Sequence, residues 1–198
     1  MAISNVAIAN RALQKLGAKR IESLTQDHPN ARSINACFDL VRDAELRRYD
    51  WAFAISRASI AASTSDTLFG SWNRFAVPND YLRLLLDDED DTVVDWRLEG
   101  KYEPDGESAL FIITQDAAPL EIRYIARVTD PTTFDALFID ALTCKIAIEC
   151  CEEITGSNSK KESLKDDYKF AINEAKRLGS IERSEKDPPE DEWVAARR

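Results

Sequence analysis

Apolar positions along the chain change their spacing twice, which divides the sequence into three parts. Over the first fifty residues they recur every three or four positions, as in amphipathic helices. From Trp51 they alternate with polar residues at a period of two, as in strands, and from Phe134 the helical spacing returns. The pattern therefore predicts two helices, a β region and two more helices.

Start and stop signals place the two N-terminal helices. Ser4 is a favourable N-cap for the first helix, and Gly17 is a favourable stop. The apolar face between them consists of Val6, Ala9, Leu13 and Leu16. A second helix is predicted after Pro29, running to about Tyr49, and its apolar face consists of Ile34, Cys37, Phe38, Val41 and Ala44.

The two C-terminal helices differ in how much of their surface is apolar. Residues 134–155 are apolar nearly all round, so we expect this helix to be buried among several neighbours, and residues 156–158 to end it. The next helix has one apolar seam, formed by Leu164, Tyr168, Ala171, Ala175 and Leu178. From about Ser184 the chain has no core pattern and contains Pro188-Pro189, which predicts a tail.

Four segments of the central region have strand character. They are 81–86, 93–98, 109–114 and 120–128, the last with strict alternation of apolar and polar residues. Turn residues at 115–119 and at Pro104-Asp105-Gly106 predict hairpins. Because no helix lies between the strands, we expect one antiparallel sheet of about five strands.

The predicted fold is therefore α+β, with a four-helix bundle formed by both ends of the chain. Residues 1–50 and 131–183 form the bundle, 51–130 form an inserted antiparallel β domain, and 184–198 form a flexible C-terminal tail. Charge follows this division: the net charge is +2 over 1–50, −8 over 51–130 and −4 over the remainder, which gives −10 for the 198 residues. The bundle and the β domain are therefore expected to face different surroundings.

Composition excludes several classes of protein. Hydrophobic residues make up 44% of the chain, which excludes disorder of the whole chain. No uncharged apolar run approaches the roughly 18 residues that span a bilayer, so we expect no membrane partner. The N-terminus lacks the basic and apolar regions of a signal peptide.

Candidate chemistry is sparse. The single histidine, His28, has no nucleophile motif near it, residues 156–161 lack the second glycine of a phosphate loop, and the acidic run 87–91 is interpreted as a solvated turn. The four cysteines lack metal-ligand spacing, and we expect them to be buried thiols that act as small apolar side chains. They are Cys37, Cys144, Cys150 and Cys151. We therefore predict no catalytic, cofactor-binding or metal-binding residues.

Two groups of residues are candidates for a partner interface. Arg11, Lys15 and Lys19 are spaced by four and would form a basic stripe on the first helix. In an acidic chain, such a stripe is more often a subunit contact or a solvated face than a DNA site. The second group lies in the tail and combines an apolar pair with two arginines: Trp193, Val194, Arg197 and Arg198. Aromatic residues and arginine are common interface anchors.

Seven short segments follow one another in the order of a known family. They are Ile8-Ala9-Asn10-Arg11-Ala12-Leu13, Leu16-Gly17-Ala18, Arg42-Asp43-Ala44-Glu45-Leu46-Arg47-Arg48-Tyr49-Asp50-Trp51-Ala52-Phe53-Ala54, Val77-Pro78-Asn79-Asp80-Tyr81-Leu82-Arg83, Trp96-Arg97-Leu98-Glu99-Gly100, Ile122-Arg123-Tyr124-Ile125 and Phe134-Asp135-Ala136-Leu137-Phe138-Ile139-Asp140-Ala141-Leu142. Together they cover about residues 3–183. Because the segments occur in the same order, the chain resembles the tail tubular protein A, or head-to-tail adaptor (connector), family of tailed bacteriophages.

The resemblance implies a structural protein of the virion neck that has no catalytic activity and no cofactor. Members of the family form a ring, commonly of twelve copies, which joins the portal protein to the tail nozzle or other tail proteins. The implied partners are therefore further copies of the chain, the portal, tail proteins and the genomic DNA that passes without sequence-specific binding. The implied location is the head–tail neck of the virion, after assembly in the host cytoplasm.

The family's helical bundle with an inserted β domain agrees with the order of elements predicted from periodicity. The chain departs from the family at residues 101–107, where relatives often have a shorter turn. On the residues alone, two other functions stay open: a small acidic soluble enzyme, such as a hydrolase, and a helical regulatory module that binds a peptide.

Overall fold

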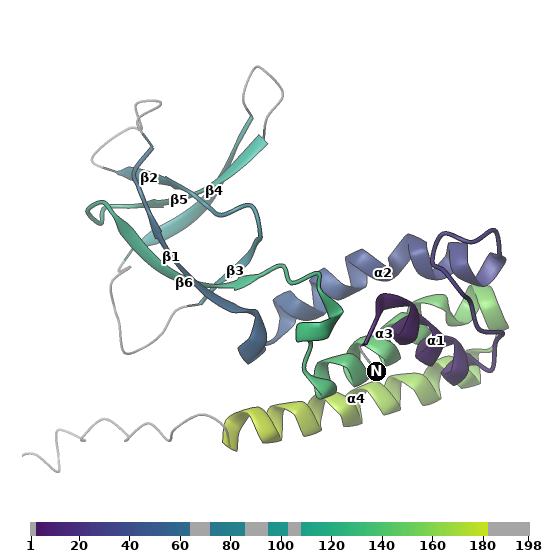
Figure 1. Ribbon diagram of the computed structural model, residues 1–198. Helices are drawn as coiled ribbons and strands as arrows, with labels where there is room; N and C mark the ends of the chain where they lie inside the picture. The colour runs from purple at the N-terminus through teal and green to yellow at the C-terminus, as the bar shows by residue number, and fades with distance from the viewer. Residues whose placement is uncertain (1–2, 64–71, 86–94, 103–107, 182–198) are drawn as a thin grey trace, which may run out of the picture.

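The structure, a computed structural model, describes residues 3–63, 72–85, 95–102 and 108–181. They form four α-helices and two small antiparallel sheets, which confirms the α+β prediction. The helices gather at one end of the molecule and the sheets at the other (Figure 1). None of the helices in these ranges combines the length and apolar character needed to span a bilayer.

The helices lie where the sequence places them, because their end signals are strong. Their bounds are Asn5–Leu16 (α1), Pro29–Arg48 (α2), Ala136–Thr155 (α3) and Asn158–Ile181 (α4). The Ser4 hydroxyl accepts a hydrogen bond from the Ala7 amide, as an N-cap does. Gly17 ends α1 with a φ of 73°, a left-handed conformation that costs glycine little. His28 caps α2, since its Nδ1 accepts from the Asn30 amide.

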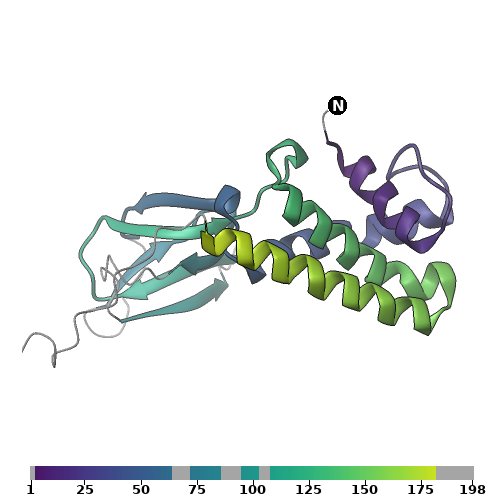
Figure 2. The same cartoon turned by 90° about the horizontal axis from the view of Figure 1, so that it is seen from below.

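Helix α3 is the centre of the helical part, which is the name we give to α1–α4. It contacts each of the other three helices, and α2 and α4 flank it on opposite sides (Figures 1 and 2). Phe138, Leu142 and Ile146 are fully buried in it, and Cys144, Cys150 and Cys151 are buried too. The expected nearly all-round burial of this helix is confirmed.

The prediction of one sheet is wrong, because the strands form two sheets of three. The inner sheet, which adjoins the helices, has the order β1-β6-β3, and the outer sheet has the order β2-β5-β4. The strands are Ile55–Ile60 (β1), Asn73–Ala76 (β2), Tyr81–Leu85 (β3), Trp96–Tyr102 (β4), Ser108–Thr114 (β5) and Leu120–Ala126 (β6). The predicted hairpin through 115–119 does not form, since β5 and β6 belong to different sheets. Alternation assigns the faces of a strand but does not choose its neighbour.

The Pro104-Asp105-Gly106 turn and the acidic run 87–91 lie outside the described residues. On either side of the predicted turn, β4 and β5 pair antiparallel, with Tyr102 opposite Ser108. The predicted tail, 184–198, is also outside the described ranges.

Two apolar cores explain how the two parts of the molecule hold together. The smaller core lies between the sheets and includes Phe75, Ile112 and Tyr124. The larger core lies among the helices and extends into the near end of the inner sheet through Leu82 of β3 and Ile125 of β6. Strand β6 therefore keeps one face buried along its whole length, and from Tyr124 to Ala126, next to the helices, both of its faces are buried.

Burial along α2 differs from the prediction at one face. Ala44, expected in the core, is exposed, whereas Arg42 and Glu45 are buried at 5% and 0% relative exposure. Cys37 is only half-buried, so the expectation of buried thiols holds for the other three cysteines and not for this one. Both buried charges have partners: Arg42 pairs with Asp39 and Asp43 of its own helix, and Glu45 accepts a hydrogen bond from Tyr168 of α4.

Candidate functional site at the junction of helices and sheet

The predicted basic stripe on α1 does not form a free cationic surface. Arg11 pairs with Asp140 of α3, with 2.5 Å between Nη2 and Oδ1, and Lys15 Nζ pairs with Asp167 Oδ2 of α4 at 3.0 Å. Lys19 is exposed but lies beyond Gly17, past the end of the helix, so it does not continue the row. Arg11 and Lys15 keep their spacing on α1, and only Lys19 is separated from them by the glycine stop.

The structure leaves the interface role of both predicted groups untested. Trp193, Val194, Arg197 and Arg198 lie outside the described residues, and their contribution to an interface stays a prediction.

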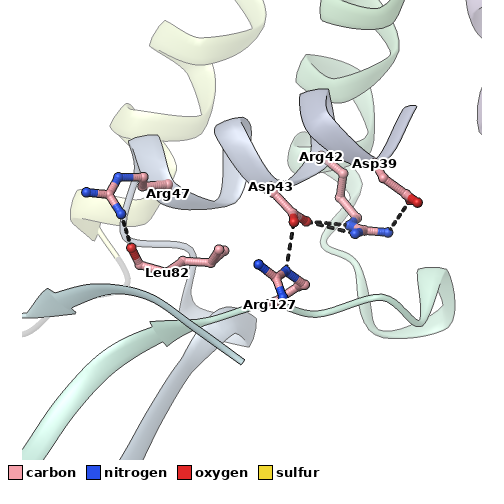
Figure 3. A network of polar contacts seen from close by, with 6 residues as sticks. All are labelled: Asp39, Arg42, Asp43, Arg47, Leu82 and Arg127. Carbon is pink, nitrogen blue, oxygen red and sulfur yellow. Dashed lines mark hydrogen bonds and ion pairs between the residues drawn. The ribbon is translucent and has the colours of Figure 1, made fainter. Parts of the chain in front are cut away.

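The densest polar contacts lie where α2 meets the inner sheet, a region we call the junction (Figure 3). The Arg42 guanidinium, with a side chain only 6% exposed, donates to Asp39 at 2.7 Å and to Asp43 at 2.8 Å. The second oxygen of Asp43 accepts from Nε of Arg127, the residue after β6, at 2.7 Å. Asp43 thus bridges two arginines, one from the helix and one from the sheet.

A second set of contacts joins the end of α2 to β3. Arg47 donates to the backbone carbonyl of Leu82 (Figure 3), and Arg83 Nε donates at 2.9 Å to the backbone carbonyl of Arg47. Arg83 also pairs with Asp50, just after the helix. Two arginines therefore cross between the elements in opposite directions, which fixes the position of β3 along α2.

The loop before β3 completes the junction from the sheet side. The Asp80 backbone carbonyl accepts from the Arg127 amide at 2.6 Å, and its carboxylate accepts from the Tyr124 hydroxyl at 3.1 Å. Asp80 therefore ties the start of β3 to the end of β6. The Arg127 side chain is in this way held opposite Asp43.

Aromatic packing supports the junction from inside. Trp51 and Phe53 follow α2 directly, and their rings each lie 5.1 Å from the Phe138 ring of α3, centroid to centroid. Phe134 lies 4.9 Å from Phe138 in an edge-on arrangement. The Trp51 indole N–H donates to the backbone carbonyl of Glu45 at 3.0 Å. These contacts fix the direction in which the chain leaves α2 and enters β1.

A buried carboxylate links the same stretch of α2 to α4. Glu45 Oε2 accepts from the Tyr168 hydroxyl at 2.8 Å, and Oε1 lies 3.4 Å from Arg48 Nη1. Burial raises the pKa of Glu45, although the hydrogen bond from Tyr168 and the charge of Arg48 oppose the rise. Burial and the neighbouring Glu45 likewise raise the pKa of Tyr168.

The shifted pKa gives a testable dependence of stability on pH. Because the folded protein binds a proton at Glu45 more tightly than the unfolded chain, wild type should gain stability relative to Glu45→Gln as pH falls. The gain should begin at the raised folded-state pKa and end near the ordinary glutamate value of about 4.3. Urea unfolding of both proteins from about pH 8 to pH 4 measures it.

The companion variant Tyr168→Phe removes a hydrogen bond that holds the Glu45 pKa down. It should therefore move the same pH window upward. A difference between wild type and Glu45→Gln that is constant over the whole pH range would contradict the assignment.

Sequence reasoning found the segments of the junction but not their contacts. The resemblance singled out 42–54 and 77–83, and these two segments, far apart in the chain, meet here. The sequence signal at this site was the presence of three arginines within residues 42–48.

In the described ranges, no group of three or more histidine, cysteine, aspartate or glutamate side chains is arranged to hold a metal ion. Comparison of the chain with protein-family models and with curated proteins gives no match.

Proposed function

We propose that this chain is a head-to-tail adaptor of a tailed phage virion, which forms a ring of twelve copies between portal and tail. In this proposal α1–α4 act as one bundle, built from 1–50 and 131–183, and the β domain of 51–130 is an insertion. One observation carries the proposal: the segments 42–54 and 77–83, which resemble the adaptor family, form one structural unit at the junction.

The junction also has the mechanical property that an adaptor requires. An adaptor binds one neighbour through one end and another neighbour through the other, so its two parts must keep a fixed relative orientation. Here charge-assisted hydrogen bonds donated by Arg127, Arg47 and Arg83 supplement a continuous apolar core. The net charge of −8 over 51–130 would repel DNA phosphates, so DNA could pass without sticking.

Two exposed apolar side chains provide the basis for a ring contact. Leu40 on α2 is 75% exposed and Phe170 on α4 is 72% exposed. Their helices, α2 and α4, flank α3 on opposite sides (Figure 1), and in this proposal the two side chains face different neighbours in the ring. A ring requires this arrangement, since each copy must present unlike surfaces to its two neighbours.

Substitution of either side chain should therefore prevent ring formation without unfolding the chain. For Leu40→Ser and Phe170→Ser we expect the ring population to fall at least about tenfold, as for the loss of an interface anchor. Native mass measurement over a range of protein concentrations gives the population, and circular dichroism reports the fold. Lys169→Ser, at the exposed neighbour of Phe170, is the matched control. Rings that form equally well in all three variants would refute this contact.

The tail gives a separate test of attachment to the portal. Deletion of 184–198 should leave the melting temperature nearly unchanged, because this segment has no core pattern, but should weaken binding to portal rings. Co-sedimentation with rings of the portal protein from the same genome measures binding. Trp193→Ser should reproduce the defect, and Glu190→Gln in the same segment is the control. Unaltered affinity of the truncated protein would leave the tail without a role in anchoring.

A further inference from the structure

Helices α2 and α3 bring two cysteines into contact. The sulfur of Cys37 lies 3.5 Å from that of Cys150, although 113 positions separate them in the sequence, and both thiols are free. Cys150 is 2% exposed, whereas Cys37 is half-buried. A small thiol-reactive molecule in solution can therefore reach the pair through Cys37.

The contact changes the acidity of both thiols. The hydrogen bond with Cys150, together with burial, raises the pKa of Cys37, and the same bond lowers the pKa of Cys150. Cys150 is therefore the member of the pair that ionises first. The thiolate is the form that attacks a disulfide, so Cys150 is suited to resolve a mixed disulfide formed on its neighbour.

We propose that Cys37 and Cys150 are a redox-active pair that closes to a disulfide between α2 and α3 on exposure to a low-molecular-weight disulfide, such as oxidised glutathione. Cys37, the member of the pair that solvent reaches, first attacks the oxidant as its proton passes to the hydrogen-bonded Cys150 thiolate. A mixed disulfide forms on Cys37, and the released glutathione thiolate takes the proton from Cys150. The Cys150 thiolate then attacks the Cys37 sulfur and releases the second. Two protein thiols are oxidised and one oxidised glutathione is reduced to two glutathione molecules, while the two protons pass to the released thiolates.

The geometry allows this step with a small movement. The two sulfurs must approach from 3.5 Å to about 2.05 Å, and they lie on helices that already pack against each other.

The other two cysteines have different surroundings. Cys151 contacts the Thr155 hydroxyl and the Ser157 carbonyl, and Cys144 is buried on α3 close to Lys15. The proposal does not depend on the adaptor function.

The test uses the native full chain. After incubation with oxidised glutathione, the protein is denatured, its remaining thiols are alkylated, and its peptides are mapped by mass spectrometry. We expect a peptide pair joined through Cys37 and Cys150, with Cys144 and Cys151 alkylated. The melting temperature should rise by about 5 °C or more and return to its starting value on addition of dithiothreitol, since the bond closes a long loop.

Two variants and a control make the result specific. Cys37→Ser and Cys150→Ser should lose the cross-link and the thermal shift, and Cys151→Ser should keep both. Three results would overturn the proposal: four alkylated thiols after oxidation, a glutathione adduct on Cys37 that does not resolve, or a cross-linked protein that melts below the reduced one. Each is read from the wild-type protein, so the outcome does not depend on whether the serine variants fold.

Discussion

Replacement of Leu142 by alanine is expected to lower the free energy of unfolding by about 2–5 kcal/mol. Leu142 is fully buried on α3, the helix that contacts all three others, so a cavity there removes contacts with several elements at once. Ile146→Ala, at another fully buried position of the same helix, should lose a similar amount. Urea unfolding followed by circular dichroism measures both.

The matched control for this prediction is Leu40→Ala. It makes the same chemical change on a helix, but at a side chain that is 75% exposed, and in dilute solution it should cost well under 1 kcal/mol. Equal losses at Leu142 and Leu40 would contradict the description of α3 as the buried centre of the helical part.

The second large effect is expected at the junction. Asp43→Ala should cost about 2–4 kcal/mol, because it leaves the buried Arg42 guanidinium with only one carboxylate and deprives Arg127 of its partner. Asp39→Ala removes the other partner of Arg42, but Asp39 is 78% exposed, so its loss should cost under about 1 kcal/mol. Chemical unfolding of the two variants side by side measures the contrast.

A double-mutant cycle separates the buried charge from the rest of the effect. In an Arg42→Met background no buried guanidinium remains, so Asp43→Ala should cost less there than in wild type. An unchanged cost in that background, or equal costs for the Asp39 and Asp43 variants, would show that Asp43 does not balance the charge of Arg42.

The helices could be predicted from the sequence because their signals are local. Ser4, Gly17 and Gly156 act on neighbouring backbone groups, and apolar spacing identified α3 as a buried helix. The strand β6 was also found from its alternation. Its pairing with β1 and β3 was not, since both partners are short and alternation does not specify pairing.

The junction could not be predicted because its contacts are not local. A helical pattern assigned Ala44 to the apolar face of α2 and did not include Arg42 and Glu45, which are buried. The contacts that complete the site are distant in the chain: Arg127 bonds Asp43 from 84 positions away, and Tyr168 bonds Glu45 from 123 positions away. The contact between Cys37 and Cys150 escaped notice for the same reason, as no motif spacing joins them.

The adaptor function is tested most directly by electron microscopy of the full chain mixed with rings of the portal protein from the same genome. The account predicts a second ring of twelve copies on the tail-facing side of the portal, with the acidic residues 51–130 directed away from the portal contact. A chain that stays monomeric and leaves the portal rings bare at saturating concentration would contradict it.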